Sequence, residues 1–420
     1  MLLRNLFFSG IIYLALSGLS VVSLGAADQP RAWPPDQFLP LTETRIAALP
    51  EAEQGVWRKY LEASRELARV VPTPTVPDFS PDKPLTAPLT GGRYSKGLRV
   101  DADPKWYAGE EVRAQASRVG EWQSAVGGWT KSNDYSISPG PKKDKSDVWS
   151  AGTFDNDATI VELRFIARVL DASPDDKRAV AWRASFMRGL QYIFAAQYPN
   201  GGFPQIYPLV GGYHDAITYN DNAMVRVLEL LADIAAGKQE FAFVPVEPRA
   251  EAGRRLGLGL ECILKSQIVE PSGRRTVWCQ QHDMLTLKPC AARNFEPIAA
   301  SASESVNLIR LLMKLRGADP AVTSAVGDAV AWMEKVALRD VVWNQHRLES
   351  KPGAMHLWSR MYEIGTDKPV FGDRDRTIHY ELGEISAERQ KGYAWFGDWP
   401  ISVLREYKKC QGKPATGQKR

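Results

Sequence analysis

"TFDNDATIVEL", which begins at Thr153, and "TYNDNAMVRVL", which begins at Thr218, carry the same pattern twice. Each has a threonine, an aromatic residue, three consecutive Asp or Asn residues, an alanine and then apolar residues at helical spacing. A weaker third copy, "SASESVNLIRLLM", begins at Ser301. The first two copies lie 65 residues apart, which is enough for an inner helix, a loop, an outer helix and a return loop. We therefore expect three helical hairpins in a ring, with their inner helices starting at one shared rim.

Apolar residues recur at every third and fourth position in several segments, which is typical of amphipathic helices. These segments are residues 42–71, 160–170, 179–197, 224–236, 250–265, 306–315 and 321–338. Strand-like alternation is scarce. The connections at 197–221 and 277–301 are long and rich in Gly, Pro and aromatic residues, and ordered loops of this kind commonly carry function. The expected fold is all-α, with few short strands and long functional loops.

The composition limits the class of protein without identifying its partner. The 420 residues are 44% hydrophobic, which is enough for a large core. The net charge of +4 comes from 53 basic and 49 acidic residues, a balance that argues against nucleic acid as a partner. Basic residues gathered in a cleft would still attract an acidic substrate. The sequence does not determine the oligomeric state, and we take a monomer as the expectation.

The chain begins in the manner of an exported protein. Arg4 precedes an apolar run that ends in small residues at 25–27, which is the pattern of a secretory signal. Cleavage there would release a secreted or periplasmic protein with no stable membrane association, whereas an uncleaved run would remain as an anchor. We divide the chain into a signal peptide (1–27), an N-terminal helical and proline-rich segment (28–92), the main helical domain (93–410) and a disordered tail (411–420).

The spacing of the cysteines gives a weaker prediction, which concerns metal binding and disulfide pairing. Cys262, Cys279, Cys290 and Cys410 lack the paired spacing of a zinc site. Disulfides form in exported chains, and the expected pair is Cys279 with Cys290.

The Asp/Asn clusters at 155–157 and 220–222 have two interpretations. Side-chain oxygens of Asp, Asn and Thr commonly cap the free amides of a first helical turn, and a single cluster would be assigned that role. Three consecutive Asp or Asn residues exceed what one cap uses, however, and they occur twice at matched positions. Carboxylate and amide oxygens that converge with water and substrate oxygens suit Ca²⁺ better than zinc. The clusters therefore indicate a calcium site at the shared rim.

Seven sequence blocks resemble family 10 of the pectate lyases. In chain order they are "GGWTKSNDY" (from Gly127), "TFDNDATIVELRFIARV" (Thr153), "AAQYPNGGFPQIYP" (Ala195), "ITYNDNAMVRVLELL" (Ile217), "ARNFEP" (Ala292), "SRMYEIGTDKPVFGDRD" (Ser359) and "ERQKGYAWFGDWP" (Glu388). They follow the order of the family and span roughly residues 91–407. The resemblance implies an (α/α)3 toroid of paired helices and calcium-assisted β-elimination of polygalacturonate, with a catalytic arginine.

The resemblance also implies roles for individual residues at the reaction centre. Arg293, in "ARNFEP", matches the arginine assigned as the base. Asp155 and Asn156 match the first acidic pair at the metal and substrate centre. Asp221, in "YNDNA", matches the second calcium carboxylate. The implied calcium ligands are thus Asp155, Asn156 and Asp221, and Asp155 also contacts the substrate.

Other residues are expected to bind the substrate around this centre. Arg360 and Arg374 match arginines that grip substrate carboxylates, and Lys131 is a further expected substrate contact. Without the resemblance, both arginines would be assigned to surface ion pairs. Some loop aromatics would either stack on sugar rings or pack beneath the loops: Trp129, Phe203, Tyr207 and Tyr219.

The residue types suit the implied chemistry. Removing the C5 proton of a galacturonate unit creates negative charge that spreads onto its carboxylate, where a divalent cation and guanidinium groups stabilise it. The base is the difficult step, because a free guanidinium has a pKa above about 12. A dry pocket and neighbouring cations would lower the pKa of Arg293. A calcium-bound hydroxide oriented by Arg293 is the alternative base, and Arg293 is expected to be essential in both cases.

Two other functions fit the same pattern. Toroids of paired helices also host inverting glycoside hydrolases, in which Asp155 and Asp221 would act as acid and base around a water. A secreted protein that binds acidic polysaccharide without cleaving it is the second alternative. Only the lyase yields a conjugated double bond that absorbs in the ultraviolet, and only the lyase requires Ca²⁺, so an absorbance assay separates these functions.

Overall fold

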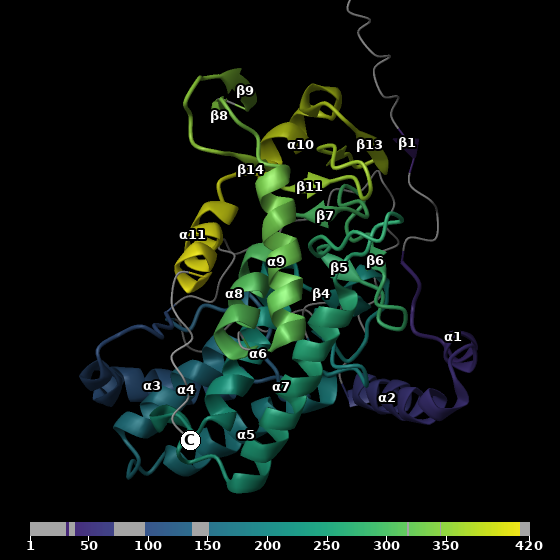
Figure 1. The fold of residues 1–420 in the computed structure, drawn as a ribbon. Coiled ribbons are helices and arrows are strands. Elements are labelled where there is room, and N and C mark those ends of the chain that lie inside the picture. The colour runs from purple at the N-terminus through teal and green to yellow at the C-terminus, as the bar shows by residue number, and fades with distance from the viewer. Residues whose placement is uncertain are drawn as a thin grey trace, which may run out of the picture.

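Helices dominate the structure, a computed structural model that describes residues 31–32, 38–70, 97–136, 151–316, 319–344 and 346–411 (Figure 1). The expected signal peptide, the proline-rich run and tail residues 412–420 lie outside the described residues. The helices are α1 (Glu43–Ala47), α2 (Glu51–Val70), α3 (Glu110–Glu121), α4 (Ile160–Ala172), α5 (Ala179–Ala196), α6 (Ala223–Ala235), α7 (Val246–Ser266), α8 (Ser305–Arg316), α9 (Pro320–Lys335), α10 (Ala387–Gly392) and α11 (Pro400–Gln411). Within those ranges, none of the helices is both long enough and apolar enough to span a bilayer.

Three helical hairpins form the body of the domain, as the repeated motif predicts. The inner helices α4, α6 and α8 pack side by side, and α5, α7 and α9 each return against the inner helix that precedes them. Most side chains of α4 and α6 are buried, whereas α7 buries a narrower face. This is the difference expected between an inner and an outer helix. The fold is therefore all-α, an (α/α)3 toroid of paired helices.

The apolar periodicity predicted these helices closely. Each of the six helices expected between residues 160 and 338 starts within four residues of its expected position, and the largest difference is Val246 against 250 for α7. The exception is the single helix expected over 42–71. It is divided into α1 and α2 just before Glu51, because Pro50 fits the start of a helix but not its interior.

Short strands connect the long loops to the inner helices. β2 pairs with β3, β4 with β5 and β7 with β11, all antiparallel, and β2, β4 and β7 each lead toward an inner helix. This pairing fixes the loops at the rim. The strands are β1 (Arg31–Ala32), β2 (Gly152–Thr153), β3 (Ile206–Tyr207), β4 (Ile217–Thr218), β5 (Gln281–His282), β6 (Pro289–Cys290), β7 (Ala300–Ser301), β8 (Val341–Asn344), β9 (Arg347–Ser350), β10 (Trp358–Ser359), β11 (Met361–Tyr362), β12 (Phe371–Gly372), β13 (Thr377–His379) and β14 (Phe396–Gly397).

The N-terminal segment docks on the main domain through α2. Its buried residues recur at helical spacing: Trp57, Tyr60, Leu61 and Ser64. Tyr60 Oη donates a hydrogen bond to the Ala196 carbonyl at 2.9 Å, and the Leu209 amide donates to Ser64 Oγ at 2.9 Å. These contacts attach α2 to the end of α5 and to the loop that follows it. Figure 1 shows α2 beside the ends of the long helices.

The disulfide expected between Cys279 and Cys290 is wrong. Both residues are buried free thiols. β5 pairs with β6 so that Gln281, and not Cys279, lies opposite Cys290. The Cys279 thiol instead donates a hydrogen bond to the Cys290 carbonyl oxygen at 3.5 Å. The thiol of Cys279 therefore contacts the main chain of residue 290.

Replacing Trp57 by Ala tests whether α2 is an integral part of the fold. Trp57 is 3% exposed and packs on Tyr198, with ring centres 5.6 Å apart. Truncating a buried tryptophan should lower the free energy of unfolding by about 3–5 kcal/mol. The adjacent Val56→Ala, at a residue that is 52% exposed, should change it by less than about 0.5 kcal/mol. Urea unfolding measures both, and equal midpoints would show that α2 does not dock.

Candidate active site

The two Asp/Asn clusters form short 3₁₀ turns at the starts of inner helices. They are η3 (Asp155–Asp157), before α4, and η5 (Asn220–Asn222), before α6. The last two residues of each turn adopt left-handed backbone angles, with φ between 50° and 64°. Asp and Asn tolerate this conformation better than other residues with a Cβ. The two turns therefore share the same left-handed φ angles at their last two residues. They also lie in contact with each other.

These clusters do not cap the helices that follow them. Neither α4 nor α6 has a side-chain capping bond at its start. The amide groups instead donate to the neighbouring carboxylates, from Asn156 Nδ2 to Asp155 Oδ2 at 3.3 Å and from Asn220 Nδ2 to Asp221 Oδ2 at 3.1 Å. In each turn one carboxylate, Asp155 or Asp221, is thus oriented by an adjacent amide, while the second carboxylate of η3, Asp157, pairs with Arg226 at 3.3 Å.

Asp221 is a half-buried carboxylate with no cationic side chain paired to it in the described part of the chain. Burial raises its pKa above the usual range, and the negative charges of Asp155 and Glu304 raise it further, while Arg360 and Arg293 act in the opposite direction. A bound divalent cation would relieve this repulsion. Oxygen ligands from Asp and Asn also suit a hard cation. The residue types of the expected calcium ligands, and the raised pKa of Asp221, are thus compatible with a bound cation.

The protein side chains do not complete such a site by themselves. Within the described ranges, no group of three or more His, Cys, Asp and Glu side chains is arranged to hold a metal ion. Asp155 also pairs with Lys131, whose Nζ lies 2.6 Å from Oδ2. Because Ca²⁺ takes about six to eight oxygen ligands, the amide of Asn156, water and substrate oxygens would have to supply the remainder.

Arg293 lies on the loop between β6 and β7 and pairs with Glu296. Its Nε donates to Glu296 Oε2 at 2.8 Å, its Nη2 donates to the other carboxylate oxygen, and its backbone amide donates to Oε2 at 3.2 Å. Glu296 is buried, whereas 32% of the Arg293 side chain is exposed. Burial lowers the pKa of Arg293, but the charge and hydrogen bonds of Glu296 outweigh it and hold the pKa above its usual range. Arg293 is thus a cation in this structure.

Two aromatic rings bring the three expected arginines together. The guanidinium carbons of Arg360 and Arg293 lie 4.7 and 5.8 Å from the centre of the Tyr393 ring. Those of Arg293 and Arg374 lie 4.8 and 5.5 Å from the centre of the Phe295 ring. Cation–π attraction favours these contacts. Arg293 is therefore linked by one ring to each of the arginines that are expected to bind substrate carboxylates.

The arginines expected to bind substrate are paired with glutamates in this structure. Arg360 donates through Nη2 to the buried Glu304. Arg374 binds Glu388 through Nε at 2.9 Å and Nη2 at 3.0 Å, and 39% of its side chain is exposed. A galacturonate carboxylate would have to share or replace these partners. The exchange is easiest at Arg374, because it lies closest to solvent.

Hydrogen bonds connect the loop that carries Arg293 to the second turn. Tyr393 Oη donates to Glu296, the partner of Arg293, at 2.9 Å. Gln280 Nε2 donates to Tyr393 Oη at 3.0 Å and to Asn220 Oδ1 of η5 at 3.2 Å. Because η5 also contacts η3, the structure brings the segments that carry the expected base and the expected metal ligands close together.

Sequence reasoning missed the acidic partners of the arginines and the aromatic residues between them. Glu296 follows Arg293 by three residues, and this i,i+3 spacing could have predicted the ion pair between them. Glu304 ends the "SASE" start of the third copy of the motif, but nothing in the sequence links it to Arg360. The aromatics considered for sugar stacking are instead buried in the core: Trp129, Phe203, Tyr207 and Tyr219.

Comparisons with known proteins define the class. The pectic acid lyase family matches residues 123–404. A family 10 polysaccharide lyase from Cellvibrio cellulosa, solved as an Asp-to-Ala mutant in complex with trigalacturonic acid, is 30% identical over 74% of this chain and 98% of that chain, with a TM-score of 0.64. A second structure of a family 10 lyase from this organism is 30% identical over 76% of this chain and 99% of that chain, also with a TM-score of 0.64. None of the curated proteins compared with the chain matched it.

The fold is thus that of a polysaccharide lyase. The chain belongs to the pectic acid lyase family, family 10 of the polysaccharide lyases. This membership argues against the glycoside hydrolase alternative, although both classes use carboxylates at the rim of a toroid.

Asp221→Asn tests the cation site without an activity assay. Because the pKa of Asp221 is raised in the folded protein, its ionisation costs more there than in the unfolded chain, and stability is lost as the pH rises through the folded pKa. At neutral pH with a chelator, Asp221→Asn should therefore unfold at a temperature equal to or above that of the wild type. Added Ca²⁺ should raise the unfolding temperature of the wild type but not that of the variant.

Asp233→Asn is the matched control for this measurement. Asp233 is paired with Arg164 at 2.8 Å and with Lys238 at 2.6 Å. Its loss should lower the unfolding temperature in chelator and leave the response to Ca²⁺ intact. A calcium response that persists in Asp221→Asn would show that Asp221 is not a ligand.

Proposed function

We propose that the protein is a secreted pectate lyase that cleaves polygalacturonate by calcium-assisted β-elimination, with Arg293 as the base. The observation that carries this proposal is a set of contacts between Arg293 and the two turns: Tyr393 donates to Glu296, the partner of Arg293, and Gln280 donates both to Tyr393 and to Asn220 of η5, which contacts η3. The related lyase in complex with trigalacturonic acid supports polygalacturonate as the substrate. The signal-like start of the sequence supports secretion.

Substrate binding would use the arginines linked to Arg293. Arg360 and Arg374 would bind the carboxylates of galacturonate units, because guanidinium groups match carboxylates with two parallel hydrogen bonds. Their present partners, Glu304 and Glu388, are also carboxylates. A substrate carboxylate that displaced the buried Glu304 would leave that glutamate uncompensated, so we expect the substrate to share Arg360 with Glu304. Glu388 is exposed, so it can be displaced from Arg374 into solvent.

The elimination itself requires three changes in one galacturonate unit. The C5 proton leaves, the bond from C4 to the glycosidic oxygen breaks, and a double bond forms between C4 and C5. The departing oxygen, which stays on the neighbouring unit, takes up a proton from water. The developing negative charge spreads onto the carboxylate of that unit. Calcium bound at Asp155 and Asp221 would supply positive charge there. Arg293 would take the proton on a neutral guanidinium nitrogen. This step requires Arg293 to be uncharged before the proton is transferred.

Glu296 controls that resting charge. It stabilises the cationic form of Arg293, while burial favours the neutral form. Substrate that closes over the site would strengthen the effect of burial, and the neighbouring arginines act in the same direction. Arg374 lies close enough that its pKa is affected by the charge of Arg293. Arg293 can act as the base only if Glu296 raises its pKa less in the substrate complex than it does in this structure.

An absorbance assay tests the activity. Polygalacturonate with wild-type protein and Ca²⁺ should give an unsaturated product that absorbs in the ultraviolet, and a chelator should abolish it. Arg293→Ala and Arg293→Lys should each lose about 10²- to 10⁴-fold in rate, because both remove the guanidinium. Arg389→Lys is the control, since Arg389 also contacts Phe295, at 4.3 Å, and should lose far less.

Three outcomes would contradict the proposal. Cleavage that is insensitive to chelator would remove calcium from the reaction, and an active Arg293→Ala protein would remove the proposed base. Binding of polygalacturonate without any cleavage would favour the non-catalytic alternative.

Glu296→Gln tests whether neutral Arg293 is the base. Removing the charge of Glu296 should lower the pKa of Arg293, so that a larger fraction is neutral at a given pH. If neutral Arg293 is the base, the rise of kcat/KM with pH moves to lower pH. If a hydroxide on calcium is the base, the rise stays in place. Glu388→Gln, which removes the partner of Arg374, should leave the pH dependence unchanged and serves as the control.

A further inference from the structure

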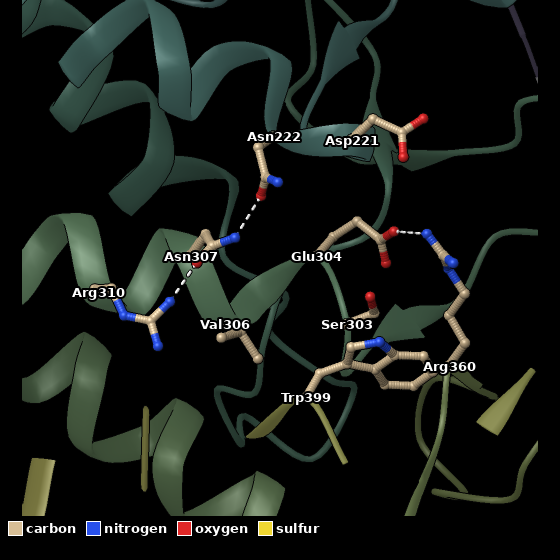
Figure 2. A pocket seen from close by; sticks show the side chains of 9 residues that line it. All are labelled: Asp221, Asn222, Ser303, Glu304, Val306, Asn307, Arg310, Arg360 and Trp399. Carbon is tan, nitrogen blue, oxygen red and sulfur yellow. Dashed lines mark hydrogen bonds and ion pairs between the residues drawn. The ribbon is translucent and has the colours of Figure 1, made fainter. Parts of the chain in front are cut away.

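A cavity of about 260 Å³ opens beside the candidate active site (Figure 2). Its lining includes three residues of that site, Asp221, Glu304 and Arg360. The rest of the lining has no role so far: Asn222, Ser303, Val306, Asn307, Arg310 and Trp399. Pockets that hold drug-sized ligands measure about 300–1,000 Å³. A cavity of this size therefore suits one sugar unit.

Trp399 forms one wall of the cavity, at the end away from Asp221 in Figure 2. One side of its ring lies against Gly397, where a Cβ would collide with the indole. Its indole nitrogen donates to no acceptor in the part of the chain that the structure describes, whereas those of the buried Trp129 and Trp278 donate to backbone carbonyls at 2.7 Å. A half-buried indole with one supported side and an unused N–H group suits stacking on a ligand ring.

A chain of hydrogen bonds fixes the amide groups of the cavity. Asn307 Nδ2 donates to Asn222 Oδ1 at 2.7 Å, and Arg310 donates to Asn307 Oδ1. Arg310 is held in turn by Glu406 of α11, at 2.8 and 2.9 Å. Because the Oδ1 atom of Asn222 already accepts a bond, its Nδ2 group is left to donate to a ligand. Figure 2 shows the Asn222 amide directed toward Asn307 within the cavity.

The charges of the cavity largely cancel away from Asp221. Glu406 balances Arg310, and Arg360 balances Glu304. The remaining lining offers amide and hydroxyl groups from Asn222, Ser303 and Asn307. Such groups recognise the hydroxyl oxygens of a sugar, while a carboxylate of the same chain would be bound by Arg360, as proposed above.

We propose that this cavity is a sugar-binding subsite next to the cleavage centre. Trp399 stacks on one galacturonate unit, and Asn222 binds its hydroxyl groups. Asn307 is a positioning residue that orients Asn222. The inference rests on the proposed function, because the bound unit belongs to the same polygalacturonate chain. It has a kinetic consequence: oligomers long enough to fill the cavity are cleaved more efficiently than shorter ones.

The test is the dependence of kcat/KM on substrate length, measured with di- to hexagalacturonate. For the wild type, kcat/KM should rise at the length that first fills the cavity. Trp399→Ala should lower kcat/KM about tenfold for oligomers at and beyond that length and change it little for shorter ones. Trp399→Phe, which keeps an aromatic ring, should retain most of the rise. Unfolding temperatures of both variants show whether they fold.

Trp343→Ala is the control, because Trp343 packs on Phe396 of the same strand as Gly397 but does not line the cavity. It should leave the dependence on length unchanged. If Trp399→Ala lowers kcat/KM equally for all lengths, or leaves the rise intact, the residue has a structural role and the subsite is rejected.

Calorimetry separates failure of the subsite from failure of the proposed function. If the wild type cleaves none of the oligomers, the proposed function fails, and the subsite is judged by binding alone. Hexagalacturonate should then bind Trp399→Ala about tenfold more weakly than the wild type. Equal affinities, or no binding to the wild type, would overturn the inference.

Discussion

The contact between the two left-handed turns, η3 and η5, is the constraint on which the rest of the site depends. Each turn redirects the chain just before an inner helix and presents one carboxylate, Asp155 or Asp221, at the rim. The packing of α4 against α6 fixes how the turns meet. Burial raises the pKa of Asp221, and the nearby charge of Asp155 raises it further, so a bound cation would relieve the cost of ionising this carboxylate.

The opposite side of the site is organised by charge balance. Arg293, Arg360 and Arg374 each carry a glutamate partner, and aromatic rings lie between neighbouring guanidinium groups. This arrangement holds several cations close together without a substrate, because each charge is compensated. In the proposed function, the carboxylates of an acidic polysaccharide would bind these arginines beside or in place of the glutamates, which a neutral sugar could not do.

Features that are local in the sequence were predictable, and features that depend on long-range pairing were not. Helical periodicity located the inner helices, and consecutive Asp and Asn residues located both turns. The pairing of Arg360 with Glu304, 56 residues earlier, arises because β11 pairs with β7, and no local pattern encodes it. The disulfide expected at Cys279 was wrong because strand register, which spacing does not determine, sets which atoms meet. Glu296 was within reach of a local pattern, but its effect on the pKa of Arg293 required the burial of both residues.

The most direct measurement is anomalous X-ray diffraction from crystals of the protein grown with Ca²⁺ and an oligogalacturonate. We expect one anomalous peak within about 2.3–2.6 Å of an Asp221 carboxylate oxygen, with Asp155 and Asn156 at the same ion or its water shell. Arg293 should face C5 of the sugar unit bound to that ion. A calcium peak away from η3 and η5, or Arg293 directed away from the bound sugar, would contradict the proposed reaction centre.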